Sequence, residues 1–344
     1  MVENTAGQHA AAADDFLYLA GTSTTGPSPR NEPGSPAEIA VEVGTLSAGR
    51  TDQGGERFGP FGPATVKPFS ITRPAVDQSA LLKIYRGVEP LARRDREADA
   101  LRMARLSGVS TPSVLATGEH VDHAWSVLSF VPGTPCSIAT ASGVDDFVRR
   151  ALSVIAQVHS HGRWLGLTPG SGWRQESDGG STVTHREFLS GQLSPRCRRQ
   201  PWWQEFHAML AALDPEPTVY LQGDIKPEHL LIDGARVHVV DWEASARGPA
   251  VCDYADMLFH LVRDVVYAGA PRQRLPLDAL SQVPAFGPVV AWRLALWLDR
   301  RRPDDLHSLT PHDIHRLSRT STPADAAREL GALIAEFRSN GVPR

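Results

Sequence analysis

The stretch Val219–Glu243, VYLQGDIKPEHLLIDGARVHVVDWE, decides the fold of this chain. It predicts a short strand at Val219–Leu221, a loop at Gln222–His229, a strand at Leu230–Ile232 and, after an Asp-Gly turn, a second strand that ends at Asp241. An Asp-Gly pair between two apolar runs is typical of a β-hairpin, because glycine accepts the positive φ that a tight turn needs. The stretch therefore predicts a polar loop followed by a hairpin.

The hairpin returns Asp241 to the end of the structure at which Asp224 lies, with His229 between them in sequence. Two carboxylates then face one small space. A lone aspartate in a turn is most often a turn former, but a pair placed by a hairpin is a more specific signal. This arrangement suits a nucleotide bound with a metal ion, where one carboxylate receives a hydroxyl proton and the other holds the metal.

At these residues the chain resembles the protein-kinase-like superfamily, and in particular its aminoglycoside phosphotransferase (choline-kinase-like) branch. That branch usually reads H-G-D-x-x-x-x-N, followed by a strand and [IV]-D-[WF]-[ED]. In this sequence Gln222 replaces the usual His, and His229 replaces the usual Asn. The resemblance extends more weakly from about Arg57 to about Asp256. Four residues match the pattern: Asp224, Asp241, Trp242 and Glu243.

The resemblance implies an α+β, two-lobed protein-kinase-like fold, with a small β-rich N-lobe and a larger, mainly helical C-lobe. We expect a flexible N-terminal arm at residues 1–50, a nucleotide-binding N-lobe at 51–131, and a catalytic and acceptor-binding C-lobe at 132–344. The implied activity is transfer of the γ-phosphate of ATP to a hydroxyl group, with Mg²⁺ or Mn²⁺ as the metal.

The resemblance also assigns roles in the C-lobe. Asp224 is expected to be the base that accepts the hydroxyl proton, and Lys226, in D-x-K-P, to contact the γ-phosphate. Asp241 is the expected main metal ligand, with His229 at the second metal position. Because Mg²⁺ prefers oxygen ligands and imidazole suits softer metals, His229 leaves three alternatives: no second metal, a metal bound through Glu243, or Mn²⁺.

In the N-lobe, the predicted strand Ser79–Tyr85 carries Lys83, which resembles the lysine that holds the α- and β-phosphates in kinases. A helix is predicted at Arg93–Leu106, with one apolar face that includes Leu106. Glu97 on this helix occupies the position of the family's lysine partner. Neighbouring arginines offer a surface ion pair as the alternative.

The hinge between the lobes is expected after the predicted strand Ala124–Phe130, which ends at a Val-Pro-Gly turn. In the family the adenine binds to backbone groups there, which implies Ser129 and Val131. Two segments compete for the phosphate-covering loop. One is Arg57–Val66, between two expected strands, and the other is Val43–Gly49, which follows the predicted strand Ile39–Val43.

The remaining C-lobe is predicted to be helical at four places. These helices are Asp145–His161 with one buried face, Trp202–Leu213, Pro284–Arg302 and Asp325–Phe337. Between the first two, Leu167–Pro201 is glycine-rich and predicted to be a loop and mobile cover. Asp253 is expected to be an N-cap that also bonds the catalytic loop, while His159 is interpreted as a cap or core residue rather than a catalyst.

Composition narrows the class of protein. The chain has 344 residues, 41% hydrophobic content and a net charge of −4, which gives no case for nucleic-acid or membrane binding. Three widely spaced cysteines, with no apolar run long enough to span a bilayer, indicate a cytoplasmic protein.

The acceptor stays open at this stage. A Ser/Thr side chain of a ribosomally made precursor peptide, in natural-product biosynthesis with a partner lyase, competes with a small-molecule hydroxyl. An aminoglycoside resistance kinase is an alternative, and a pseudokinase scaffold is the non-enzyme alternative. The segment after Leu261 holds about a dozen arginines against about nine acidic residues, and Arg293 lies on an apolar helix expected to border the acceptor, which favours a neutral or anionic acceptor.

Overall fold

The structure is a computed structural model. It describes residue 58 and residues 60–120, 123–162, 167, 169–170, 173, 184–268, 277–283 and 286–340. The expected N-terminal arm, the strand at Ile39–Val43 and the alternative phosphate loop at Val43–Gly49 lie outside the described residues. The chain divides into two compact units and passes between them within α3 (Pro90–Leu106), between Thr111 and Pro112, and between Phe130 and Val131.

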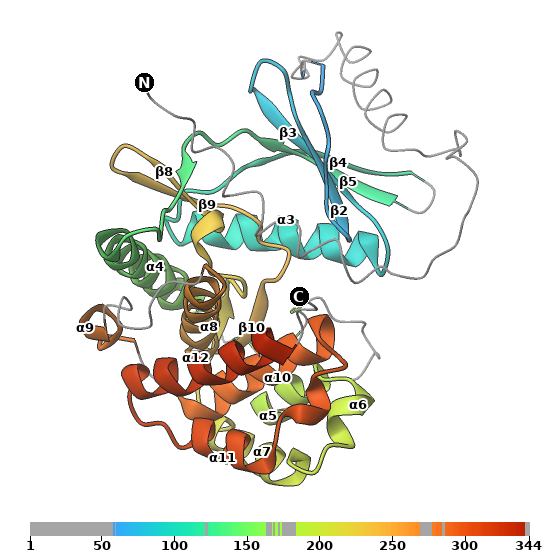
Figure 1. Cartoon of the computed structure of the whole chain (residues 1–344). Helices are drawn as coiled ribbons and strands as arrows, with labels where there is room; N and C mark the ends of the chain where they lie inside the picture. The colour runs from blue at the N-terminus through green and yellow to red at the C-terminus, as the bar shows by residue number, and fades with distance from the viewer. Residues whose placement is uncertain are drawn as a thin grey trace. The chain divides into compact units, whose positions relative to one another are not determined.

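The first unit is built on a five-stranded antiparallel sheet in the order β1-β2-β3-β5-β4, shown in blue and green in Figure 1. Its apolar residues alternate toward one core, which includes Ile71, Leu82, Ile84, Trp125 and Val127. The strands are β1 (Thr65–Val66), β2 (Ser70–Pro74), β3 (Ala80–Tyr85), β4 (Val114–His120) and β5 (His123–Ser129).

In the described part of Arg57–Val66, Thr65 and Val66 form β1, and the assignment of this segment as the phosphate-covering loop stays a prediction. The N–H of Gly62 donates to the carbonyl of Pro74, 2.7 Å away, so this amide is already used along β2. On α3, Leu106 is 57% exposed rather than part of the apolar face, because the helix ends there.

The second unit is mainly helical, which confirms the predicted two-part α+β, kinase-like fold. Its central helix α8 (Val251–Tyr267) packs against α4 (Ala141–Gly162), α10 (Gly287–Arg301) and α12 (Pro323–Asn340). The predicted buried face of α4 is confirmed by Phe147, Ala151, Val154, Ile155 and Val158. The other helices are α5 (His185–Gly191), α6 (Pro195–Arg198), α7 (Trp203–Leu210), α9 (Leu277–Leu280) and α11 (Pro311–Ser318), with 3₁₀ turns at Ala211–Leu213, Pro227–His229 and Leu306–Ser308.

Two small sheets hold the stretch that decided the fold. β7 (Thr218–Leu221) pairs with β10 (Ala246–Pro249), while β8 (Leu230–Asp233) pairs with β9 (Arg236–Val239) and with β6 (Thr134–Pro135). The hairpin is confirmed, and Gly234 has the expected positive φ of 58°. The second strand ends at Val239, two residues before the expected Asp241, and β10 is a strand that the sequence pattern did not predict.

The segment Leu167–Pro201 is also less irregular than predicted, because α5 and α6 lie within it. Threonine and serine side chains begin these two helices: Thr184 accepts from the N–H of Glu187, and Ser194 from that of Arg196. Among the described residues, no helix has the length and apolar content needed to cross a lipid bilayer.

Candidate active site

The loop after β7 is held by aspartates of α8. The carboxylate of Asp253 accepts hydrogen bonds from the N–H groups of Gln222 and Gly223, at 3.1 and 2.9 Å, and that of Asp256 accepts from the N–H of Ile225 at 2.9 Å. Buried N–H groups need such partners, so these bonds fix the backbone on both sides of Asp224. Asp253 therefore bonds the loop as expected, although it lies inside the first turn of α8 and the N-cap is Ala250.

His159 belongs to the same buried network. Its Nε2 lies 2.9 Å from Oδ2 of Asp253, on the side of the carboxylate that also receives the Gln222 N–H. This contact matches the interpretation of His159 as a polar core residue, because it supports the aspartate that holds the loop rather than a reacting atom.

Gly223 is required by the shape of this loop. It has a φ of 81°, and a Cβ atom on it would lie 2.2 Å from the carbonyl oxygen of Ala244. We expect Gly223→Ala to lower the free energy of unfolding by about 3 kcal/mol or more, through backbone strain plus the clash, as measured by urea unfolding.

Gly234→Ala is the matched control for this prediction. Gly234 also has a positive φ, 58°, but a Cβ there meets nothing within 4 Å, so only about 1 kcal/mol of strain is expected. Equal losses in the two variants would contradict the close contact with Ala244.

The Asp224 carboxylate is held through both of its oxygens. Oδ2 lies 3.2 Å from Nζ of Lys226 and 3.7 Å from Nδ1 of His229, while Oδ1 lies 3.0 Å from Nε2 of His260. Burial opposes ionisation of this carboxyl, but Lys226, His229 and His260 outweigh burial and hold its pKa well below the usual range. Asp224 is therefore an ionised, oriented carboxylate, the state from which a base can accept a proton.

Gln222, which replaces the family's usual histidine, joins the two sequence motifs. Its Oε1 accepts the N–H of Asp224 at 2.7 Å, and its Nε2 donates to the carbonyl of Asp241 at 3.1 Å. Asp241 has a φ of 59°, which is rare for a residue with a Cβ atom. The amide of Gln222 therefore links the loop that carries Asp224 to a strained residue of the loop that carries the second carboxylate.

His229 lies between the two carboxylates, as its place in the sequence indicated. Its Nδ1 donates to the backbone carbonyl of Asp224 at 3.0 Å, so in the neutral ring the lone pair is on Nε2. Nε2 is buried, has no hydrogen-bond partner among the described residues, and lies 3.3 Å from Oδ2 of Asp241. The pair thus presents one nitrogen and one carboxylate oxygen to the same point.

The remaining predicted site residues lie on several elements. Lys83, in β3, and Glu97, in α3, are both buried, and Oε1 of Glu97 accepts the N–H of Trp242 at 3.2 Å, next to Asp241. Ser129 ends β5, where its backbone N–H donates to Ser113, and Val131 follows two residues later at the boundary between the two units.

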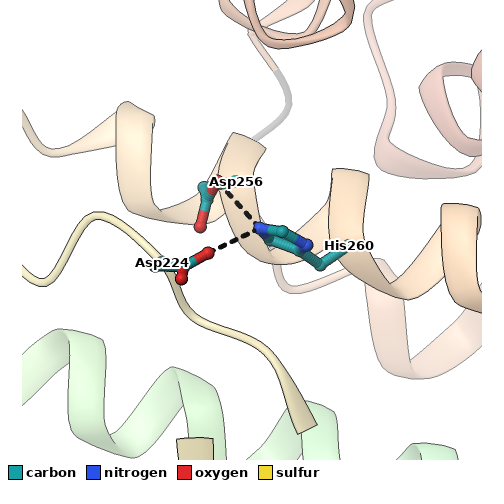
Figure 2. Close-up of side chains that lie close together, drawn as sticks. All are labelled: Asp224, Asp256 and His260. Atoms are coloured by element: carbon teal, nitrogen blue, oxygen red, sulfur yellow. Dashed lines mark ion pairs between the residues drawn. The ribbon is translucent and has the colours of Figure 1, made fainter. Parts of the chain in front are cut away.

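Sequence reasoning missed His260, and it placed Arg293 on a helix bordering the acceptor without its contact to Asp256; both residues complete the surroundings of Asp224. His260 lies one turn after Asp256 on α8 and contacts both aspartates, as Figure 2 shows. Arg293, from α10, donates through Nε to Oδ1 of Asp256 at 2.5 Å. The i, i+4 spacing of Asp256 and His260 was a usable signal for a shared helix face, but Arg293 comes from a separate helix and had none.

Comparisons with known proteins show the family and the fold. Residues 71–287, well over half of the chain, match the family described as the phosphotransferase enzyme family. Solved structures of the aminoglycoside phosphotransferase APH(4)-Ia share the fold. A complex with AMP-PNP and hygromycin B has a TM-score of 0.53 at 15% identity over 88% of this chain and 100% of that chain, and a complex with ADP and hygromycin B has 0.52 at 14% over 90% and 100%.

No curated protein sequence is a significant match to this chain. The family match over residues 71–287, together with the paired aspartate loops, confirms the resemblance found in the sequence. The chain belongs to the phosphotransferase enzyme family.

Proposed function

We propose that this phosphotransferase moves the γ-phosphate of ATP to the hydroxyl group of a non-cationic acceptor. The observation that carries the proposal is the buried carboxylate of Asp224, bonded to Lys226 on one oxygen, beside the His229–Asp241 pair. Phosphoryl transfer needs alignment and neutralisation of charge more than covalent chemistry. In this proposal Asp224 accepts the proton of the hydroxyl, while Lys226 neutralises charge on the transferred phosphate.

ATP is proposed as the donor. The APH(4)-Ia structures of the same fold hold ADP or AMP-PNP. In this chain the proposed phosphate contact is Lys83, with Glu97 as the carboxylate that holds it, and the proposed adenine contacts are the backbone groups of Ser129 and Val131. A buried lysine on a central strand is well suited to this role, because burial strengthens its attraction to phosphate oxygens.

The donor atoms of His229 and Asp241 fit a divalent cation. The Nδ1–H of His229 is fixed by a backbone carbonyl, which is how metal-binding histidines are commonly oriented, and Nε2 faces the Asp241 carboxylate. A divalent cation held there would neutralise charge on the phosphates of the bound nucleotide. Because one donor is an imidazole nitrogen, we propose that Mn²⁺ serves here at least as well as Mg²⁺.

His229→Asn tests this preference. Replacing the imidazole with an amide oxygen should raise the rate with Mg²⁺ relative to Mn²⁺, since Mg²⁺ prefers oxygen ligands. The measurement is the ratio of ATP turnover in Mg²⁺ to that in Mn²⁺, for both proteins over a range of metal concentrations. An unchanged ratio in an active variant would remove His229 from the metal site.

We propose a non-cationic acceptor because the charges around Asp224 are already balanced. The nearby carboxylates already have cations of this chain beside them. Asp224 and Glu228 lie within 3.2 and 3.3 Å of Lys226 Nζ, Asp256 is bonded to Arg293, and Asp264 is bonded to Arg263. A pocket for a polycation needs carboxylates in excess, and the described residues around the base do not supply them.

Arg263 adds to this balance. Burial works against its charge, yet Asp264, and more weakly Glu228 and Asp224, raise its pKa above the ordinary value, so the guanidinium stays charged near the base. Lys226 in D-x-K-P is a feature typical of kinases that act on protein hydroxyls. We therefore propose a Ser/Thr side chain of a precursor peptide or an uncharged or anionic small molecule as the acceptor.

The second candidate function is phosphorylation of an aminoglycoside, which the bound hygromycin B in the APH(4)-Ia structures favours. An assay with ATP, Mg²⁺ or Mn²⁺, a panel of aminoglycosides and candidate precursor peptides separates the two by mass spectrometry, where each transfer adds about 80 Da. Phosphorylated aminoglycoside without peptide or anionic product would overturn the proposed acceptor class.

The same assay addresses the wider setting of the reaction. A phosphopeptide product would be consumed by a lyase that eliminates phosphate, which is the partner expected for the peptide alternative. Binding of ATP without turnover under any condition of the panel would instead support the pseudokinase scaffold.

A further inference from the structure

We propose that His260 is a positioning residue for the reaction: its Nε2–H donates to Oδ1 of Asp224 and holds that carboxylate in its productive orientation. The proposal rests on the function proposed above for Asp224 and extends it to a residue outside the two sequence motifs. Figure 2 shows the ring of His260 with Nε2 directed toward Asp224 and Asp256.

The backbone of Asp224 is fixed, but its side chain needs a separate restraint. The Asp224 N–H bonds Gln222 and its carbonyl bonds His229, so the main chain is held at both ends. Lys226 restrains Oδ2, but its Nζ is also 3.3 Å from Glu228 and, in the proposed function, serves the transferred phosphate. His260, 3.0 Å from Oδ1, is the described partner that reaches the carboxylate from the rigid helix α8.

His260 is itself held in place. Nε2 lies 3.4 Å from Oδ1 of Asp256 and 3.0 Å from Nη2 of Arg293, and the side chain of His260 is only 4% exposed. The guanidinium of Arg293 lies 4.5 Å from the ring centroid of Phe259, which fixes its plane. Arg293 donates through Nε to Asp256, and Asp256 lies against Nε2 of His260, so the restraint runs from α10 through Asp256 and His260 of α8 to the catalytic loop.

These contacts also decide where the proton of the ring lies. Nε2 either donates one hydrogen bond or accepts one, so it cannot donate to Asp224 while it accepts from Arg293. Asp256 already accepts from Arg293 Nε and from the Ile225 N–H. A proton on Nε2 gives Asp224 its third cationic or polar partner, consistent with the lowered pKa of that carboxyl, whereas a lone pair on Nε2 would face two carboxylates.

The same three side chains have atoms close enough together to suggest a metal site, since one atom from each lies within 4.8 Å of the others. Arg293 argues against that interpretation. Its Nε and Nη2 already contact Asp256 and His260, so a guanidinium occupies the side from which a second cation would bind. Two cations at this spacing in a buried site would repel each other strongly.

The test compares two substitutions of equal reach. His260→Gln keeps a side-chain N–H donor near the position of Nε2, and His260→Met fills similar space without a donor. With the acceptor found in the panel, we expect His260→Met to lower kcat on the order of tenfold, with KM for ATP unchanged, and His260→Gln to recover most of that loss. The positioning role would be overturned if the two variants had equal kcat, or if the decrease in kcat in each variant simply paralleled the decrease in its melting temperature.

A spectroscopic arm does not depend on turnover. In protein labelled with ¹⁵N-histidine, Nε2 of His260 should carry a proton whose signal shifts in Asp224→Ala and stays in place in Asp304→Ala, at an exposed aspartate. An unprotonated Nε2 in the unmodified protein would overturn the proposal. So would a site that binds Mn²⁺ in the unmodified protein without nucleotide and loses it in His260→Met, because His260 would then be a metal ligand. Absence of transfer with every acceptor would refute the proposed kinase function, whereas the ¹⁵N-histidine experiment would still test the contact between His260 and Asp224.

Discussion

Asp224→Ala is expected to lower kcat on the order of a thousandfold while ATP binding stays nearly unchanged. A positioned general base contributes about 10²–10⁴-fold, and Asp224 is assigned to the acceptor's proton and not to the nucleotide. Its carboxylate is buried, ionised and held by Lys226 and His260, and the nearby carboxylate of Asp256 is already bonded to Arg293 and the Ile225 N–H. The measurement is initial rate beside calorimetric affinity for ATP.

The control for Asp224→Ala is Asp304→Ala, which removes an exposed aspartate far along the chain. Both variants are checked by thermal melting, because loss of the Asp224 carboxylate removes a buried partner of Lys226 and of His260. If folded Asp224→Ala retained most of the kcat, the base would have to be assigned to another residue.

Asp241→Ala is expected to remove metal-dependent nucleotide binding. Substitution of residues that only hydrogen-bond to metal ligands lowers metal affinity by about 10–100-fold. Removal of the Asp241 carboxylate itself should therefore weaken binding of ATP with Mg²⁺ or Mn²⁺ by at least on the order of a hundredfold. His229 would remain as a single nitrogen donor, too little to hold the ion. Calorimetry with ATP, with and without the metal, measures this loss.

Asp233→Ala, at an exposed position of the same hairpin, is the matched control and should bind as the unmodified protein does. Unchanged affinity in Asp241→Ala would mean that the metal site lies elsewhere. An equal loss of ATP affinity with and without the metal would instead indicate that the loop around Asp241 has lost its conformation. Asp241 has a positive φ, and its carbonyl accepts a hydrogen bond from Gln222, so the substitution could disturb this loop.

The fold was predictable because its signals are local. The Asp-Gly turn sets the register of the hairpin, and the hairpin carries Asp241 back toward Asp224 whatever surrounds it. Helices with one strong apolar stripe, such as α4, were predicted for the same reason. The ends of elements were less accurate, as at Val239, where β9 ends, and at Pro90, where α3 begins, because tertiary contacts influence where strands and helices begin and end.

The candidate site was predictable only where sequence motifs carry it. Asp224, His229 and Asp241 lie within one short stretch, so their meeting follows from a single turn. Arg293 reaches the site by the packing of α10 on α8, and no pattern within either helix records which neighbour it meets. The opposite case is β10, whose four residues become a strand only because the edge of β7 accepts them.

The position of the catalytic loop depends on the spacing of three residues along helix α8. Asp253, Asp256 and His260 are spaced by three and four, so they share one face and together grip the loop at Gln222, Ile225 and Asp224. Successive residues of an α-helix are rotated by about 100° about the helix axis. A single insertion or deletion between Asp253 and His260 would rotate part of this face away, however conservative the inserted side chain. The length of this segment of α8 is thus as tightly constrained as the identity of the three residues that hold the loop.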